Sequence, residues 1–263
     1  MQTAKKPFPL HERIAAWTVH LFTALAAVAG FFTLVSIYNH DYMQALWLMA
    51  IAVFIDAIDG TFARMVRIKS VLPSIDGALL DNMVDYLNYV ITPMFFIYIK
   101  PDMLPQQYSL IIVAIVILTS AYQFCQSDAK TPDHFFKGFP CYWNIALFYM
   151  FIFETSAGFN AWVLFILSIL IFVPIKYVYP SRLQYLTDSK GLKLLMHAYS
   201  ALFGLSLAIL LWQYPNTSIF WLSVSLSYAV VYLYLSIYRT YYPMIKSKIK
   251  AKKNHAQNQH IVE

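Results

Sequence analysis

Long runs of apolar residues, each followed by a short polar or charged stretch, make up most of this chain. A transmembrane helix needs about 20 mainly apolar residues, and eight runs reach or approach that length. They lie at residues 16–38, 43–63, 78–99, 107–126, 141–158, 160–178, 192–212 and 217–238. The pattern therefore predicts an all-α protein, a polytopic membrane helical bundle with about eight transmembrane helices.

The composition also indicates a membrane protein. Hydrophobic residues account for 60% of the 263 residues and charged residues for 12%, whereas about a quarter of a soluble globular chain is charged. The mean hydropathy is +0.56. The first apolar run, from about Ala15 to Tyr38, is longer than the apolar part of a secretory signal peptide, which spans about 7–15 residues. We therefore expect it to be retained as the first membrane helix.

The positive charges divide the predicted connections into two groups. Of the 19 lysine and arginine residues, all but Lys100 fall on one side of the eight-helix arrangement. Because lysine and arginine are enriched in cytoplasmic segments, this partition predicts that both termini and the even-numbered loops are cytoplasmic. It also indicates a border between a transmembrane domain, residues 1–240, and a basic cytoplasmic tail, residues 241–263. Such a tail suits a surface of anionic lipids, and we expect no nucleic-acid partner.

The second and third apolar runs carry carboxylates that a membrane segment normally avoids. On the second predicted helix, spacings of three and four residues place on one face Asp56, Asp59, Gly60, Ala63 and Arg64. On the third, intervals of four residues place on one face Gly77, Asp81 and Asp85. A fifth carboxylate, Asp76, lies off these stripes, and we expect it to be a loop residue or a helix cap.

Four carboxylates on two facing stripes would repel one another strongly without cations, and Arg64 supplies a single positive charge. Oxygen ligands favour Mg²⁺ or Mn²⁺, and four aspartates suit a site with two ions that binds phosphates for displacement at phosphorus. Gly60 and Gly77 have no side chain, so a ligand such as a nucleotide can approach the backbone closely. The alternative is that these acids line the pore or proton pathway of a cation-coupled transporter.

The spacing Asp56-x2-Asp59-Gly60-x2-Ala63-Arg64, followed by Gly77-x3-Asp81-x3-Asp85, resembles the signature of the CDP-alcohol phosphotransferases. Members of that family are membrane enzymes that displace CMP from a CDP-linked lipid or alcohol. The resemblance implies that divalent metal ions are held by Asp56, Asp59, Asp81 and Asp85. Asp85 is by the same resemblance the best candidate to take the proton of the acceptor hydroxyl.

The resemblance also implies a set of residues that bind the nucleotide part of the CDP-lipid, namely Asp59, Gly60, Ala63, Arg64 and Gly77. In that set Arg64 supports a phosphate or the carboxylate group. The signature motif, residues 56–85, would thus form the centre of the predicted transmembrane domain.

The connection between Arg64 and Gly77 departs from the commonest family pattern, because its twelve residues, 65–76, make it longer. The longer connection, together with "FKGFPCYWN" (136–144) and "YVYPSR" (177–182), resembles the bacterial phosphatidylcholine synthase branch of the family. That branch joins CDP-diacylglycerol to choline with Mn²⁺ or Mg²⁺ and gives phosphatidylcholine and CMP. The resemblance also implies a multi-pass protein of the bacterial inner (cytoplasmic) membrane, with its active site facing the cytoplasm. Since such relatives are commonly dimers, it implies a homodimer as well.

Choline carries a quaternary ammonium group, which aromatic faces and carboxylates bind. Tyr89 is one aromatic candidate, because it continues the stripe of the third predicted helix one turn beyond Asp85. The others lie near the cytoplasmic ends of the fourth and fifth predicted helices and are Tyr122, Tyr142 and Trp143. Candidates for supporting the phosphate or lipid are Lys137, Lys176 and Arg182, although membrane topology alone also explains positive charges there. The acceptor alcohol stays open, since serine, glycerol phosphate or inositol phosphate would suit the same family.

Overall fold

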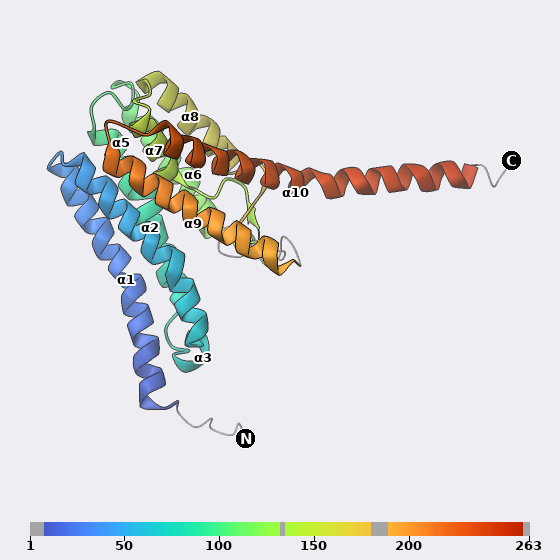
Figure 1. Cartoon of the computed structure of the whole chain (residues 1–263), viewed down its shortest axis with the longest axis horizontal. Coiled ribbons are helices and arrows are strands. Elements are labelled where there is room, and N and C mark those ends of the chain that lie inside the picture. Colours follow the sequence, from blue (N-terminus) through green and yellow to red (C-terminus); the bar gives the residue numbers. More distant parts are fainter. Residues whose placement is uncertain (1–7, 132–134, 180–188, 260–263) are drawn as a thin grey trace. The chain divides into compact units, whose positions relative to one another are not determined.

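The computed structural model describes residues 8–131, 135–179 and 189–259, with side chains up to residue 242. These residues are mostly helical, with one short antiparallel pair of strands (Figure 1). By its contacts the chain divides into two compact units. One comprises Met1–Phe124 with Cys141–Ser168, and the other comprises Cys125–Pro140 with Ile169–Glu263. The predicted all-α class is confirmed.

The first unit holds the earlier helices. In chain order they are α1 Leu10–Tyr38, α2 Tyr42–Met65, α3 Ile68–Val71, α4 Gly77–Tyr86, the π-helix η1 Leu87–Ile91, α5 Thr92–Ile99, α6 Ser109–Cys125, α7 Trp143–Ile152 and α8 Ala157–Leu170. Helices α4, η1 and α5 follow one another without a gap, so residues 77–99 are continuously helical with a wider turn in the middle. The last residue of α6 and the last two of α8 already belong to the second unit.

The second unit is built on two long helices, α9 Lys190–Gln213 and α10 Ile219–Gln259. Strand β1 Phe136–Lys137 pairs in the antiparallel sense with β2 Lys176–Tyr177. Hydroxyl groups of α10 hold β2 and the residue after it, because the amide of Lys176 donates to Thr240 at 2.8 Å and the amide of Val178 donates to Ser236 at 3.2 Å.

Helices occupy all eight of the predicted apolar runs. Among the described residues, four are both long and apolar enough to cross a membrane: α1, α2, α9 and α10 up to Tyr242. Helices α6, α7 and α8 are shorter, with 10–17 residues, and the run from residue 77 to 99 is divided among three elements. The chain is thus a membrane protein with four candidate spans. The count of eight and the cytoplasmic side of both termini stay predictions.

Small side chains allow α1 and α2 to pack closely. Ala26 and Ala29 of α1 and Ala52 of α2 are buried in one apolar cluster with Ile55 and Val84. In a membrane, lipid tails are as apolar as leucine, so close approach of backbones through small residues is what favours helix pairing. This cluster brings α1, α2 and α4 together at the level of the signature residues.

Asn88 in η1 adds a polar connection to the same assembly. Its side-chain nitrogen donates hydrogen bonds to the backbone oxygens of Ala26 at 2.9 Å and Val84 at 3.0 Å. Gly30, one turn farther along α1, leaves the room that this requires, because a Cβ atom there would lie 2.7 Å from Oδ1 of Asn88. A larger residue at position 30 would push η1 away from α1.

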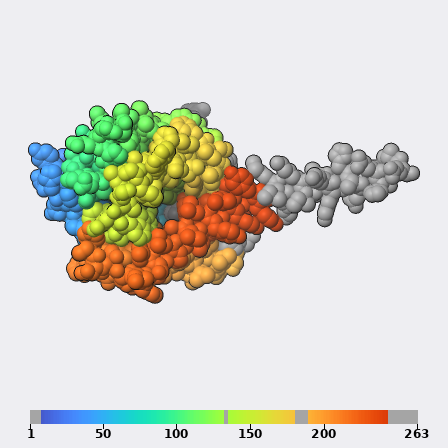
Figure 2. Space-filling model, turned by 90° about the horizontal axis from the view of Figure 1, so that it is seen from above, coloured from blue at the N-terminus to red at the C-terminus, as the bar shows by residue number. Residues whose placement is uncertain are grey.

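Helix α10 continues past the predicted domain border at residue 240 and ends at Gln259. The border therefore marks a change from apolar to basic sequence rather than the end of a helix. Up to Tyr242 its side chains form a continuous band in the space-filling view (Figure 2). Many of them are apolar and exposed, such as Ile219 at 81% and Val230 at 65%. Such an extended apolar surface suits the hydrocarbon core of a bilayer.

Candidate active site

Three of the signature carboxylates come together from α2 and α4. Asp56, Asp81 and Asp85 are half-buried, and one carboxylate oxygen of each lies within 4.8 Å of the others. The local sequence explains part of this arrangement, because Asp81 and Asp85 are about one turn apart on α4 and share its face. A group of three carboxylate oxygens fits a hard divalent cation such as Mg²⁺ or Mn²⁺.

Asp59, the fourth signature aspartate, is held by a different helix. It is buried, and its Oδ2 accepts a hydrogen bond of 2.8 Å from the hydroxyl group of Thr23 on α1. In the part of the chain that the structure describes, the group of three carboxylates does not include Asp59. Carboxylate oxygens accept more than one bond, so Thr23 orients Asp59 without excluding a ligand.

A wider helical turn follows Asp85 and directs Tyr89 toward α2. Residues Leu87–Ile91 form the π-helix η1, and single turns of this kind are frequent at functional sites. The hydroxyl group of Tyr89 donates a hydrogen bond of 2.7 Å to Oδ2 of Asp56. Tyr89 therefore fixes the orientation of the first signature aspartate.

Tyr142, which immediately precedes α7, adds a second aromatic ring next to that of Tyr89. The ring centroids of Tyr89 and Tyr142 are 6.2 Å apart, and the two ring planes are inclined by 50°. Since Tyr89 also contacts Asp56, a pair of aromatic rings adjoins the carboxylate group. Aromatic faces beside a carboxylate provide the chemistry that binds a quaternary ammonium group.

The two signature glycines differ in their surroundings. At Gly60, the nearest atom to an added Cβ is Nη1 of Arg64 at 3.4 Å, an ordinary contact with a flexible side chain. At Gly77, an added Cβ would lie 2.9 Å from Cε1 of His20, a buried residue of α1. Packing within the chain therefore favours glycine at position 77, whereas position 60 offers space for a ligand.

The remaining residues of the α2 stripe lie at its outer end. Arg64 is exposed, and its Nη2 donates a hydrogen bond of 2.9 Å to the hydroxyl group of Thr61. Ala63 is half-buried against an apolar cluster that includes Val19 and Ile68. A small residue at position 63 keeps this end of α2 close to the connection that follows.

The long connection between the two signature helices packs against α1. Its short helix α3 buries Ile68 and Val71 in a cluster with Val19 of α1. In addition, Nη2 of Arg67 lies 3.1 Å from Oε2 of Glu12, also on α1. Both groups of this ion pair are partly exposed to solvent, so the apolar cluster contributes more to the order of the connection than the ion pair.

Asp76 ends this connection and caps α4. Its Oδ1 accepts hydrogen bonds from the backbone amides of Ala78 at 3.0 Å and Leu79 at 3.1 Å. Capping satisfies amides that have no partner within the helix. The prediction that Asp76 serves as a cap is confirmed.

The sequence that contains both carboxylate-bearing helices matches a known enzyme family. The sequence model of the CDP-alcohol phosphatidyltransferases covers residues 17–174, more than half of the chain. The chain belongs to this family. The match extends far beyond residues 56–85, and the resemblance seen in the signature is confirmed.

Individual members of the CDP-alcohol phosphatidyltransferase family are similar over most of the chain. The phosphatidylcholine synthase of Legionella pneumophila is 63% identical over 251 residues, which cover 95% of this chain and 98% of that protein. The phosphatidylcholine synthase of Legionella bozemanae is 66% identical over 217 residues, 82% of this chain and 100% of that protein. That of Borreliella burgdorferi is 42% identical over 169 residues, 64% of this chain and 72% of that protein.

Two of the aromatic residues singled out from the sequence lie in different surroundings from Tyr89 and Tyr142. Trp143 is fully buried, and its indole nitrogen donates a hydrogen bond of 2.8 Å to Ser120 of α6. Its ring is thus part of the core, and we leave it out of the proposed choline pocket. Tyr122, on α6, is 51% exposed, and its role in choline binding stays a prediction.

The basic residues predicted to support the lipid lie in the second unit or outside the described residues. Nζ of Lys137 lies 2.6 Å from Oδ2 of Asp128, and this ammonium group lowers the pKa of the Asp128 carboxyl group. Nζ of Lys176 lies 5.9 Å from the ring centroid of Phe135. Arg182 falls outside the residues that the structure describes. The phosphate-binding role of all three stays a prediction.

Sequence reasoning missed the contribution of α1. Thr23 contacts Asp59, and His20 packs on Gly77. The signal was present, because His20 and Thr23 are polar residues three positions apart in a mainly apolar run. The pattern did not reveal which helix that polar face meets.

Proposed function

We propose that this chain is a phosphatidylcholine synthase, which transfers the phosphatidyl group of CDP-diacylglycerol to choline and releases CMP. The observation that carries the proposal is the group of three carboxylates, Asp56, Asp81 and Asp85, beside the paired rings of Tyr89 and Tyr142. It combines oxygen ligands for divalent ions with aromatic faces for a quaternary ammonium group. Relatives that carry the name phosphatidylcholine synthase and share 63–66% of their residues with this chain support it.

In this proposal the four aspartates hold two divalent ions, Mn²⁺ or Mg²⁺. Asp56, Asp81 and Asp85 provide the carboxylate oxygens that already converge, and Asp59 joins them while Thr23 holds its Oδ2. The chemistry supplied by bound ions at such a site is neutralisation of negative charge on the pyrophosphate and on the departing CMP. The chain's own contribution is to hold the carboxylates in place through Thr23 and Tyr89.

The reaction is an in-line displacement at the phosphorus atom of the phosphatidyl group. The hydroxyl oxygen of choline forms a bond to that phosphorus, the bond from phosphorus to the CMP oxygen breaks, and CMP leaves with the bonding electrons. The choline hydroxyl loses its proton, and we assign Asp85 as the base that takes it. Asp85 suits this role because it lies one turn along α4 from Asp81 and one turn before Tyr89, so it would connect the residues that hold the ions with the aromatic rings.

The nucleotide part of CDP-diacylglycerol would bind along the α2 stripe. The surroundings of Gly60 support this, since the nearest side-chain atom to an added Cβ belongs to the flexible Arg64, at an ordinary contact distance of 3.4 Å. We assign Arg64 to the pyrophosphate, because its guanidinium group has five N–H donors and only one of its nitrogens is engaged by Thr61 in the contacts described above. Asp59, Ala63 and Gly77 complete the proposed surface for the cytidine.

Choline would bind next to Tyr89 and Tyr142. A quaternary ammonium group has no hydrogen to donate, so it is held by aromatic faces and by nearby negative charge. The hydroxyl end of choline then points toward Asp85, and the methylated end toward the rings. An anionic acceptor such as glycerol phosphate would need basic side chains in place of the rings of Tyr89 and Tyr142, which is why we favour choline over acceptors of that kind.

We further propose that the chain crosses the bacterial inner (cytoplasmic) membrane about eight times, with both termini and the active site on the cytoplasmic side, and that it forms a homodimer. The distribution of lysine and arginine supports this orientation, because Lys100 is the single basic residue expected on the other side. A site at the membrane boundary allows the acyl chains of CDP-diacylglycerol to stay in the bilayer during the reaction.

The decisive experiment supplies purified protein with CDP-diacylglycerol, labelled choline and Mn²⁺ or Mg²⁺. We expect labelled phosphatidylcholine and CMP in equal amounts, and loss of both when the ions are chelated. The Asp56→Asn variant, prepared in the same way, is the control for contaminating activity. Transfer to serine, glycerol phosphate or inositol phosphate but not to choline would disprove the assigned acceptor. Movement of choline across vesicles without release of CMP would instead identify a transporter.

A further inference from the structure

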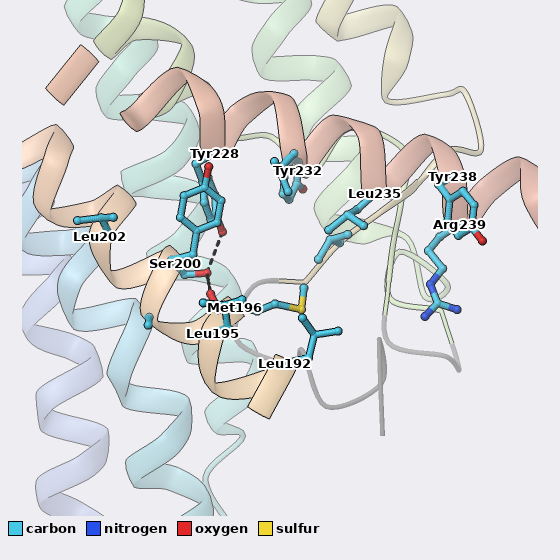
Figure 3. Close-up of a pocket in the computed structure, with 14 residues that line it drawn as sticks. Leu192, Leu195, Met196, Ser200, Leu202, Tyr228, Tyr232, Leu235, Tyr238 and Arg239 are labelled. Carbon is cyan, nitrogen blue, oxygen red and sulfur yellow. Dashed lines mark hydrogen bonds between the residues drawn. The ribbon is translucent and has the colours of Figure 1, made fainter. Parts of the chain in front are cut away.

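A groove lies between the two long helices of the second unit, α9 and α10. It has a volume of about 670 Å³ and is lined by α9, by α10 and by Val178 after β2. Leu202 and Arg239 lie at its two ends, and Leu192, Leu195, Met196 and Leu235 line the space between them (Figure 3). Nearly all of this lining is hydrocarbon.

Two pairs of hydroxyl groups between α9 and α10 are engaged with each other. The hydroxyl groups of Ser200 and Tyr228 are hydrogen bonded at 3.0 Å across the two helices, and those of Tyr199 and Ser227 are hydrogen bonded at 2.7 Å. The ring of Phe203 stacks on Tyr228, with the centroids 4.3 Å apart. Because these hydroxyl groups already have partners, their presence in the wall carries little penalty for an apolar occupant.

The length of the groove corresponds to one leaflet of a bilayer. Tyr228 and Arg239 both line it and are eleven residues apart on α10, which is roughly 16 Å at 1.5 Å per residue. Half of a hydrocarbon core of about 30 Å is nearly the same length. An extended acyl chain therefore fits along the groove from one end to the other.

The charge of the groove is confined to one end. Arg239 lies there, seven residues before Lys246, the first lysine of the basic tail. The sequence that follows is strongly basic, with five lysines between residues 246 and 253. A guanidinium group at the depth of the headgroups binds phosphate through several N–H donors, and basic residues near a membrane surface favour anionic lipids.

We propose that this groove binds an anionic glycerophospholipid of the surrounding membrane, with one acyl chain between α9 and α10 and the phosphate at Arg239. The lipid is a bound partner and not the reacting CDP-diacylglycerol. The proposal stands on residues of α9 and α10 only, and does not depend on the function proposed for the carboxylate group.

The test uses the full-length protein in vesicles of phosphatidylcholine that contain a small fraction of phosphatidylglycerol with a photoreactive acyl chain. After irradiation, labelled peptides are identified by mass spectrometry. We expect the label to concentrate on residues of α9 and α10 that line the groove. Ala198→Trp fills the groove, because Ala198 lines it, and should remove most of this label. Ala201→Trp is the matched control, since Ala201 is an exposed residue of the same helix outside the lining.

Two substitutions test the role of Arg239. One removes the positive charge, and the other keeps the charge but changes the shape of the side chain. Arg239→Gln should lower retention of phosphatidylglycerol, measured by native mass spectrometry, by about fivefold, while Arg239→Lys should retain most of it. Arg67→Gln, at an exposed arginine of the first unit, should have no effect. Equal labelling of the two tryptophan variants, or label spread evenly over all exposed helices, would show an annular lipid only and overturn the proposal. Loss of labelling when CDP-diacylglycerol is present during irradiation would also overturn the proposal, because the groove would then bind the substrate.

Discussion

The hydroxyl group of Thr23 on α1 donates a hydrogen bond of 2.8 Å to Oδ2 of Asp59 on α2. A residue outside the signature thus orients one of the aspartates within it. Groups that orient metal ligands commonly change metal affinity or activity about 10–100-fold when they are removed. We infer that α1 is part of the active site, although it supplies no carboxylate to it.

The first prediction concerns this hydrogen bond. Thr23→Val keeps the size of the side chain and removes the donor, so we expect the affinity for Mn²⁺ to fall about 10–100-fold, while Thr23→Ser should retain most of it. Titration of Mn²⁺ against turnover and against direct binding measures the effect. Thr33→Val is a suitable control, because Thr33 is buried on the same helix and bonds only the backbone oxygen of Ala29 in the contacts described. Equal metal affinity in the two valine variants would exclude the assigned role of Thr23.

The second prediction separates the role of Asp85 as a base from the role as a metal ligand that it shares with Asp56. Asp85→Asn should lower turnover about 10²–10⁴-fold, the usual contribution of a general base, while binding of CDP-diacylglycerol and of metal remains substantial. Asp56→Asn should weaken metal binding more than Asp85→Asn does, because the carboxylate of Asp56 belongs to the converging group and is also held in place by the hydrogen bond from Tyr89. Single-turnover rates and direct metal titration on the two variants distinguish these outcomes. Near-normal turnover of Asp85→Asn would remove Asp85 from the base role, and unchanged metal affinity of Asp56→Asn would count against its ligand role.

Helical periodicity explains why much of this site was predictable. Spacings of three and four residues place the aspartates of α2 and α4 on two stripes, and the position of Asp76 before Gly77 identifies the cap of α4. Periodicity within one helix does not determine which neighbour a face meets. The contact of Asp59 with Thr23 and that of Gly77 with His20 therefore required the structure.

The sequence pattern did not predict the π-helix Leu87–Ile91 either. A regular helix through residues 78–99 was expected, and nothing in the apolar run "LNYVI" marks a wider turn. The hydrogen bonds of Asn88 to α1 and of Tyr89 to Asp56 accompany this turn. Contacts between distant segments, and not local propensity, account for it.

The third prediction separates the two roles of Tyr89. Tyr89→Phe keeps an aromatic face but removes the hydrogen bond to Asp56, so we expect weaker metal binding with a nearly unchanged KM for choline. Tyr89→Leu removes the ring as well and should raise the KM for choline about tenfold, in line with a cation–π contact of roughly 1–2 kcal/mol. Kinetics at saturating Mn²⁺ measure the difference. If the leucine and phenylalanine variants had the same KM for choline, the ring would have no part in choline binding.

The fourth prediction concerns the cap of α4. Asp76→Ala should lower the free energy of unfolding by about 1 kcal/mol, because the amides of Ala78 and Leu79 lose their partner. Asp76→Asn or Asp76→Ser, which also cap helices, should recover most of that loss. Thermal unfolding in detergent measures stability, and metal titration is the second measurement. Loss of metal affinity in Asp76→Ser at unchanged stability would mean that Asp76 is a ligand instead.

The last prediction compares the two signature glycines. Gly77→Ala places a Cβ atom 2.9 Å from Cε1 of His20, and such overpacking of a buried contact costs about 1–3 kcal/mol of stability. The same substitution should cost less in a His20→Ala background, since the neighbouring ring is then absent, and a double-mutant cycle measures the coupling. Gly60→Ala should leave stability nearly unchanged, because the added Cβ would lie at an ordinary contact distance from its nearest neighbour, Nη1 of Arg64. The same substitution should weaken the binding of CDP-diacylglycerol. Additive effects of Gly77→Ala and His20→Ala would contradict the assigned contact. Normal CDP-diacylglycerol binding by Gly60→Ala would contradict a nucleotide at that position.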